Sequence, residues 1–268
     1  MTDHLRADCA RCFALCCVVP AFSASSAFAI DKPAKRPCPN LRSDFRCGIH
    51  TELRSAGFPG CTVYDCFGAG QQVSQVTYAG ENWRENPHAA RQMFDVFPIM
   101  RDLHELLWYL TEAHAHVPSP TLADALTDIE LLTRQSPAEI LAIDVDAHRR
   151  RINQLLLQAS ARIRKGHKGK DHRGANLIGV AMANADLRGA SLRGAYLIGA
   201  NLTGADLRMA DLTGADLRDA DIGAADLSTS LFLTQAQLDA ARGDSHTTIP
   251  VSRTRPAHWR GSGGSTSH

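Results

Sequence analysis

The chain has 268 residues, with 29 basic and 28 acidic residues and a formal net charge of +1. This balance argues against a protein that binds polyanions through bulk charge, and against a strongly acidic mimic of nucleic acid. The length allows two modest domains. No stretch of about 18 residues is continuously apolar, so we do not expect a membrane span.

Residues 1–75 are rich in Cys, Gly and Pro, and they contain all eight cysteines of the chain. A segment with so little apolar periodicity makes a poor hydrophobic core, so it needs a metal or disulfides to hold it. We therefore expect a Cys-rich first domain over residues 1–75. Its cysteines are Cys9, Cys12, Cys16, Cys17, Cys38, Cys47, Cys61 and Cys66.

The stretch CARCFALCC, residues 9–17, allows three interpretations. It could belong to an export signal, but the residues before it are barely basic, and cleavage after Ala29 would discard four cysteines. It could open a disulfide framework, but the adjacent Cys16 and Cys17 cannot readily pair with each other. A metal site is the favoured interpretation, because a C-x-x-C knuckle lets two thiolates converge on one ion.

All eight cysteines are candidate metal ligands, and His50 is a further candidate because it follows Cys47 by three residues. Soft thiolate ligands suit zinc or an iron–sulfur cluster. Four ligands fill one zinc site or one cluster, so eight could serve two sites, or one site plus structural thiols. The motif C-A-R-C-F-A-L-C-C resembles the CxxCxxCC family, described as zinc- or iron-chelating domains, although its last gap is three residues and not two. That resemblance implies a class of ligand and no reaction.

Residues 76–165 are expected to form a small α-helical bundle. A first helix follows Asn86, a typical N-cap, with Pro87 at the first helical position. Apolar residues recur there every three or four positions, and Pro98 is expected to kink or break the pattern. A shorter helix is expected near residues 121–133. His104, within the first helix, is interpreted as a histidine at the edge of the core or in solvent.

A further helix is expected from a capping box that pairs Ser136 with Glu139, and it should run to about residue 165. The polar, glycine-rich residues 166–174 then form a linker.

The next segment repeats every five residues, in twelve units over residues 175–234. The central residue of each unit is Leu, Met, Ile or Phe, and the residue two positions earlier is Ala in ten of the twelve units. A period of five fits neither an α-helix nor a straight strand. It does fit a coil that turns a corner at every unit, with the large residue and the alanine inside. These units resemble the pentapeptide-repeat family, which implies a right-handed quadrilateral β-helix, here a solenoid of about three coils.

Residues 235–268 are expected to provide a capping helix and a disordered tail. Thr234 and Gln237 form a second capping box, and the helix that follows should cover the open end of the coil. Trp259 is placed to dock near this cap. The tail ends RGSGGSTSH.

The expected fold class is therefore mixed: a Cys-rich metal-stabilised domain, a helical bundle, and a β-helix with a capping helix. We expect a non-enzymatic, cytoplasmic binding or scaffold protein that carries zinc or iron and contacts another protein through its repeats. Neither a membrane nor nucleic acid is an expected partner. The repeats carry only seven acids against four bases. The alternative is an iron–sulfur or other metal-dependent enzyme or redox sensor centred on residues 9–66.

Overall fold

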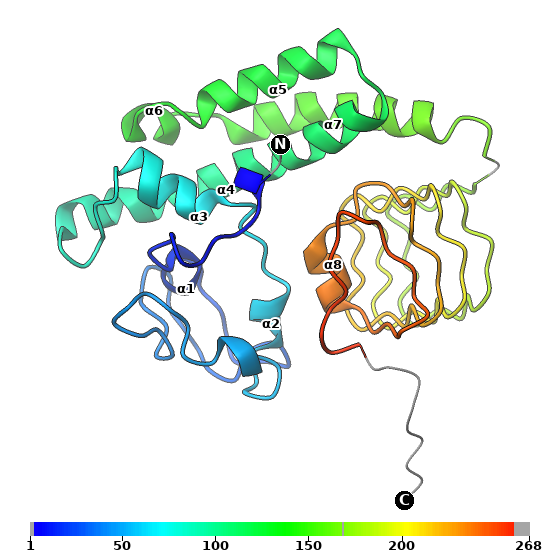
Figure 1. The fold of residues 1–268 in the computed structure, drawn as a ribbon, viewed down its shortest axis with the longest axis horizontal. Coiled ribbons are helices and arrows are strands. Elements are labelled where there is room, and N and C mark those ends of the chain that lie inside the picture. Colours follow the sequence, from blue (N-terminus) through cyan, green and yellow to red (C-terminus); the bar gives the residue numbers. More distant parts are fainter. Residues whose placement is uncertain (1–2, 168, 260–268) are drawn as a thin grey trace, which may run out of the picture. The chain divides into compact units, whose positions relative to one another are not determined.

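The computed structural model describes residues 3–167 and 169–259 of the chain (Figure 1). The chain divides into two compact units, Met1–Leu157 and Gln158–His268. Each unit is described by itself below. The finer division at residues 75, 165, 174 and 234 stays a prediction.

Short helical turns separated by loops make up the first part of unit 1. Two antiparallel bridges join its loops, one between Phe22 and Lys32 and one between Leu41 and Cys47. The π-helical turn η3 continues directly from helix α3. The turns are η1 (Asp3–Leu5), α1 (Leu15–Val18), η2 (His50–Glu52), α2 (Pro59–Thr62), α3 (Ala69–Gln71) and η3 (Gln72–Thr77).

The longest helix of unit 1 is α4 (Pro87–His116), and Asn86 is its N-cap, as expected. The Asn86 side chain accepts hydrogen bonds from the backbone N–H groups of His88 and Ala89, at 3.0 and 3.1 Å. Of the kink or break expected at Pro98, the break does not occur, because the helix continues through this residue for several further turns; the kink stays a prediction. One side of α4 is fully buried: Met93, Val96, Met100, Leu103, Leu110 and Ala113.

Helices α5 (Pro120–Leu132) and α6 (Pro137–Leu141) both pack against α4 (Figure 1). The predicted capping box of Ser136 and Glu139 is confirmed. The single helix expected after it is wrong, because α6 ends at Leu141 and a separate helix, α7 (Val145–Ile163), follows. Asp144 starts this new helix by accepting a hydrogen bond from the Ala147 N–H at 2.9 Å.

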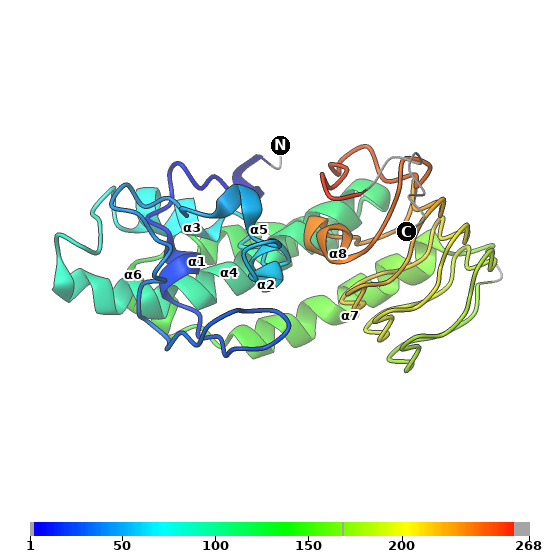
Figure 2. The same cartoon turned by 90° about the horizontal axis from the view of Figure 1, so that it is seen from below.

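The repeats of unit 2 stack as successive coils, which Figure 2 shows from the side. Residues 20 positions apart form parallel bridges, for example Asp186 with Asp206 and Ser191 with Asp211. Every such contact is an isolated bridge of one residue, and residues 3–167 and 169–259 contain no β-strand. The expected β-helix is therefore wrong as a fold class. The regular secondary structure in these ranges is helical, and the repeats form bridged coils.

The corners of the coil explain why no strand develops. The residue two positions after each central one adopts a left-handed backbone, with φ of 54–66° from position 179 to position 224. A turn at every fifth residue leaves one residue per side to pair with the next coil. Most of these corners are glycine, which adopts this conformation without steric cost. The exceptions are Asn184, Met209, Asp219 and Ala224.

The interior of the coils is a column of leucines and alanines, as the repeat predicts. Leu197, Ala200, Leu202 and Ala205 are completely buried. Burial of this kind stabilises a fold by about 25 cal/mol for each Å² of apolar surface removed from water. The core of unit 2 therefore comes from hydrophobic packing.

Helix α8 (Gln235–Ala240) starts at the predicted capping box of Thr234 and Gln237, which is confirmed. The Gln237 amide also donates 2.8 Å hydrogen bonds to the carbonyls of Leu212 and Ala215, which ties the helix to the coil. The expected docking of Trp259 is confirmed, because its indole N–H donates to the Ala241 carbonyl at 3.1 Å.

The disordered tail expected after Gly243 is wrong up to residue 259, because Thr248 forms a bridge with Asp226 and the Thr247 hydroxyl donates to the Ile222 carbonyl at 2.9 Å. The rest of the expected tail, residues 260–268, lies outside the described residues.

Candidate functional site

Helix α1 carries two of the candidate ligands at its centre. Ala14 adopts a left-handed backbone with φ of 56°, and Leu15 and Val18 are completely buried. Cys16 and Cys17 lie between these two anchors, at consecutive helical positions. Their Cα–Cβ bonds therefore differ in direction by about 100° around the helix axis. The two sulfur atoms are 4.0 Å apart.

The chain before α1 lies along the segment that follows Cys66. Asp8 donates its N–H to the Gln71 side-chain oxygen at 3.1 Å, and Phe13 donates its N–H to the Ser74 hydroxyl at 3.1 Å. The Gln75 amide donates to the Arg11 carbonyl at 2.8 Å. These bonds join residues more than 60 positions apart and fix the C-x-x-C knuckle beside α3.

Two glycines allow this close approach. A Cβ atom at Gly70 would lie 2.5 Å from the Cys12 sulfur, and one at Gly68 would lie 2.0 Å from the His4 carbonyl oxygen. Gly68 also has a left-handed backbone with φ of 78°. The G-x-G sequence after Cys66 is thereby explained by packing against residues 4 and 12.

A second set of cysteines lies near Cys17, the second of the two adjacent cysteines in α1. The Cys38 N–H donates to the Cys17 carbonyl at 3.0 Å, and the Leu41 N–H donates to the Cys38 carbonyl at 3.0 Å. Leu41 is in turn bridged to Cys47. Cys61 lies in α2, whose Gly60 packs edge-on against the Phe28 ring.

Lys32 is a buried cation at the centre of this second set. Its ammonium donates to the carbonyls of Val18 at 2.8 Å, Arg36 at 2.9 Å and Pro33 at 3.2 Å, and the residue is only 3% exposed. Burial lowers the pKa of Lys32, and nearby cysteines oppose this effect. Three carbonyl acceptors match the three donors of the ammonium, which compensates its removal from water.

The thiols differ in acidity. Burial raises the pKa of Cys12 to about 12 and that of Cys61 to about 11. The pKa of Cys16 is raised, first by its hydrogen bond with Cys17 and then by burial, whereas that bond lowers the pKa of Cys17. Because most of the pKa values are raised, most of these groups are neutral thiols in the metal-free chain. They must lose a proton to become good metal ligands, since only the thiolate binds metal well.

No disulfide joins the cysteines, which all carry free thiols. Over the ranges 3–167 and 169–259, no three His, Cys, Asp or Glu side chains already converge on a position for one ion. His50 lies exposed in η2. The structure therefore brings most of the candidate ligands into one region of unit 1 without arranging a finished coordination sphere.

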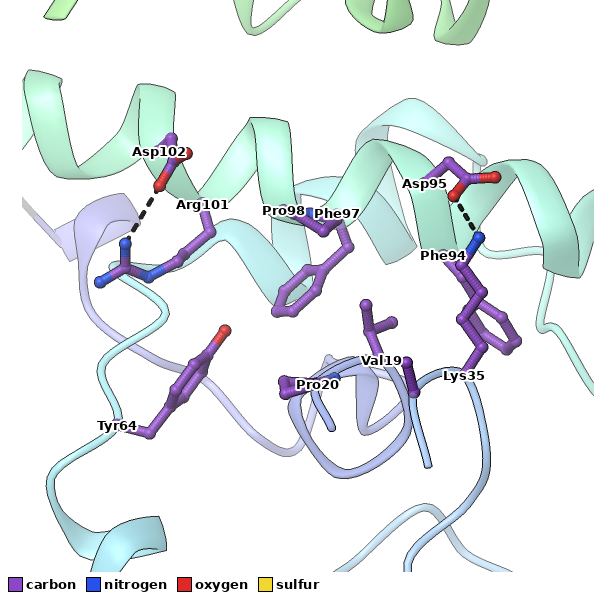
Figure 3. A pocket seen from close by; sticks show the side chains of 11 residues that line it. Val19, Pro20, Lys35, Tyr64, Phe94, Asp95, Phe97, Pro98, Arg101 and Asp102 are labelled. Atoms are coloured by element: carbon purple, nitrogen blue, oxygen red, sulfur yellow. Dashed lines mark hydrogen bonds and ion pairs between the residues drawn. The ribbon is translucent and has the colours of Figure 1, made fainter. Parts of the chain in front are cut away.

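A pocket of about 390 Å³ lies beside this region (Figure 3). It is lined mainly by apolar side chains, and two ion pairs flank it: Lys35 with Asp95, and Arg101 with Asp102 at 3.1 Å. The phenol of Tyr64 points into it. Burial raises the pKa of Tyr64, and Cys16 and Cys66 raise it further. Sequence reasoning missed this pocket, because its walls come from three distant segments.

Histidine 104 is more deeply buried than its place in the helical pattern suggests. It is only 1% exposed, and its Nδ1 lies 2.8 Å from the Phe67 carbonyl oxygen. Burial lowers its pKa to about 4, and His4 contributes to this shift. His104 is therefore a neutral, packed residue that holds the segment after Cys66 against α4.

The repeats present a face of alternating acids and bases in unit 2. Arg188 pairs with Asp186 at 3.0 Å and with Asp206 of the next coil at 3.3 Å. Arg208 repeats the arrangement with Asp206 at 2.6 Å and Asp226 at 3.5 Å. The Arg188 side chain lowers the pKa of Asp186 to about 2. Alternating charges of this kind do not produce the continuous negative field of a nucleic-acid mimic.

One acid of the coil is buried. Asp211 is 1% exposed and accepts hydrogen bonds from the Ser160 and Thr213 hydroxyls, both at 2.6 Å. Ser160 in turn accepts from the Arg164 guanidinium at 3.0 Å. This network attaches the last turn of α7 to the coil. No helix in the described part of the chain is both long and apolar enough to cross a membrane.

Comparison with known proteins identifies the repeats. A family model described as pentapeptide repeats matches residues 173–208 and 195–232, with eight copies. A protein of Bacillus subtilis strain 168, described as uncharacterized protein YybG, is 55% identical over 265 residues. That match covers 96% of this chain and 95% of the relative. The CxxCxxCC resemblance is not shown by these comparisons and stays a prediction.

Two solved structures of pentapeptide-repeat proteins resemble part of the chain. One, from the Arabidopsis thaliana thylakoid lumen, is 32% identical, with a TM-score of 0.24; the match covers 33% of this chain and 56% of that one. Another, alr5209 from Nostoc, is 33% identical, also with a TM-score of 0.24, over 35% of this chain and 84% of that one. Because the relationship to YybG extends over nearly the whole length of both proteins, the chain belongs to the same family as YybG, and it is a pentapeptide-repeat protein.

Proposed function

We propose that this pentapeptide-repeat protein binds zinc or an iron–sulfur cluster through thiolates of residues 9–66 and acts as a non-enzymatic binding protein. One observation carries the proposal: eight free thiols lie in a segment held together largely by loops and long-range hydrogen bonds. Such a segment gains folding free energy from a bound metal.

The cysteine thiols are chemically suited to bind zinc or an iron–sulfur cluster. Thiolates are the preferred ligands of zinc and of iron–sulfur clusters. The raised pKa values of Cys12 and Cys61 imply that binding releases protons from thiols that are neutral beforehand. When bound, the metal would cross-link loops that have little apolar core of their own. A reducing, cytoplasmic compartment would keep the thiols available.

The repeats are the proposed surface for another protein. Their coils form a cysteine-free column whose surface carries both acids and bases, and bulky side chains such as Tyr196 and Ile178 are about half exposed. Surfaces of mixed polarity with an exposed aromatic residue are typical of protein interfaces. Repeat proteins commonly use such extended surfaces for binding.

A redox sensor or enzyme built on an iron–sulfur cluster is the second candidate. Two observations favour it: eight thiols exceed the four that one structural zinc needs, and the pocket at Tyr64 lies close to Cys16 and Cys66. A pocket beside a cluster would give a small molecule access to it.

Anaerobic purification followed by metal analysis and a visible absorption spectrum separates the candidates. Stoichiometric zinc in a colourless protein supports the binding protein and excludes the cluster. A brown protein with stoichiometric iron and acid-labile sulfide supports the redox candidate. A folded protein that contains neither metal, and that takes up neither when reconstituted under reducing conditions, would contradict the proposal.

A further inference from the structure

Building on the proposed function, we infer that the eight cysteines form two separate four-thiolate centres, and that Cys16 and Cys17 belong to different ones. The first centre is composed of Cys9, Cys12, Cys16 and Cys66. The second is composed of Cys17, Cys38, Cys47 and Cys61.

The first group is brought together by the contacts between the two ends of the cysteine-rich segment. The hydrogen bonds from residues 8, 11 and 13 to the side chains of residues 71, 74 and 75 place the knuckle beside α3. Gly70 leaves room for the Cys12 sulfur directly against the backbone that follows Cys66. Cys12, Cys16 and Cys66 also pack in the same apolar cluster.

The second group is brought together by backbone bonds of its own. Cys38 bonds directly to the Cys17 backbone, and Leu41 connects Cys38 to the bridge at Cys47. The Gly60 N–H donates to the Ala27 carbonyl at 3.0 Å, which anchors the turn that carries Cys61. These bonds all lie within residues 17–60, outside the segment 66–75 that organises the first group.

The two groups meet at the adjacent residues Cys16 and Cys17 in α1. The Cα–Cβ bonds of consecutive helical residues point about 100° apart. The two sulfurs lie 4.0 Å apart, so on our proposal the two centres adjoin at this pair. Contacts on the two sides of α1 differ in the same way. Cys16 packs in one apolar cluster with Cys12 and Cys66, whereas the Cys17 carbonyl accepts a hydrogen bond from the Cys38 N–H at 3.0 Å.

The charge around the two groups also differs. The second group has a buried ammonium, because Lys32 is fixed by three carbonyls and interacts with Cys38, Cys17 and Cys61. Four thiolates around a divalent ion carry a net charge of about −2, and a buried cation offsets part of it. Lys32 is therefore the positioned counter-charge of the second centre.

The test uses the full chain in its reduced, metal-free form, with zinc ions as the probe. Zinc is added at less than saturating amounts, the remaining thiols are alkylated, and the intact chains are weighed. We expect chains with eight, four or no alkyl groups. In the four-label chains, fragment sequencing should find the label on one complete group: Cys9, Cys12, Cys16 and Cys66, or Cys17, Cys38, Cys47 and Cys61.

This experiment needs no variant, so it does not depend on a substitution that prevents folding. Protection of Cys16 and Cys17 in the same four-thiol set would overturn the division, as would a saturated protein with a single zinc. A chain that binds no zinc at all would instead refute the proposed function, so the two failures are distinguishable.

Variants give an independent measure. Cys16→Ser and Cys17→Ser should each bind one tight zinc fewer than the wild type. The pair Cys12→Ser with Cys66→Ser should also lose one, because both residues belong to one centre. The matched pair Cys12→Ser with Cys38→Ser should lose both. Equal losses for the two double variants would contradict the assignment.

Discussion

The cysteine-rich segment and the repeats are stabilised by different interactions. In the repeats, each central leucine contacts residues in neighbouring units, and the column of Leu and Ala is almost completely buried. In residues 9–66, by contrast, the helices are single turns and the cysteines are mostly partly exposed. Regular packing holds one region, whereas long-range hydrogen bonds and, on our proposal, metal ligands hold the other.

Metal removal should have the largest effect, and it should act on the cysteine-rich segment and not on the repeats. We expect a chelator under reducing conditions to abolish the protection of amides in residues 9–66, because a structural zinc contributes about 10 kcal/mol or more to folding. Amides of the coils should keep their protection. Hydrogen exchange followed by mass spectrometry measures both regions in one sample. Unchanged protection of residues 9–66 in demonstrably metal-free protein would contradict this expectation.

A cavity in the coil should have the next largest effect. Leu202→Ala removes a completely buried side chain and should lower the free energy of unfolding of unit 2 by about 3 kcal/mol. Ile178→Ala is the matched control, because Ile178 is 54% exposed and its loss should cost well under half as much. Urea denaturation of both variants measures the difference. Equal costs would show that the column is not the core of this unit.

The buried His104 should make unit 1 sensitive to acid. Its folded pKa of about 4 lies below the ordinary value of 6.5, so the unfolded chain binds the proton more readily. The contribution of neutral His104 to the free energy of unfolding is therefore fully present above pH 6.5. It is lost as the pH falls towards 4. Between pH 7 and pH 5 the loss should be about 2 kcal/mol.

His104→Asn provides the comparison for this effect, since an amide can still donate to the Phe67 carbonyl but does not titrate. Urea denaturation at the two pH values should show a smaller pH dependence for the variant. Both proteins share the same cysteines, so thiol and metal effects cancel in the difference. Identical slopes for wild type and variant would contradict the assigned role.

Substitutions at the left-handed corners should have the smallest effect on stability. Gly194 has φ of 63°, and a Cβ atom there would contact nothing within 4 Å. Gly194→Ala should therefore cost about 1 kcal/mol through strain alone. Met209 has φ of 59° at an equivalent corner, so Met209→Gly should relieve strain of a similar size. Thermal unfolding should show opposite shifts, and shifts of the same sign would refute this account of the corners.

The repeats were the part most open to prediction from sequence, for a physical reason. Because Leu197 and Leu202 occupy equivalent positions of one pattern, their burial follows from the period. The period does not, however, reveal how many residues pair on each side, and the left-handed corners at residues such as Gly194 limit pairing to single bridges. The prediction of a β-helix was wrong because these single bridges do not extend into strands.

The candidate site was predictable in composition and not in arrangement. The count of cysteines is visible in the sequence, but the contact of Phe13 with Ser74 spans 61 positions and has no periodic signal. The same is true of the three carbonyls around Lys32 and of the pocket at Tyr64. Local caps such as Ser136 with Glu139 were predictable because both partners lie within one turn.

The central claim is that the thiols of residues 9–66 hold two metal centres, and native mass spectrometry of the intact, reduced chain tests it most directly. Zinc titration should convert the free chain through a species with one zinc into a saturated species with two. A saturated species with one zinc, or a chain that stays metal-free under these conditions, would contradict the claim.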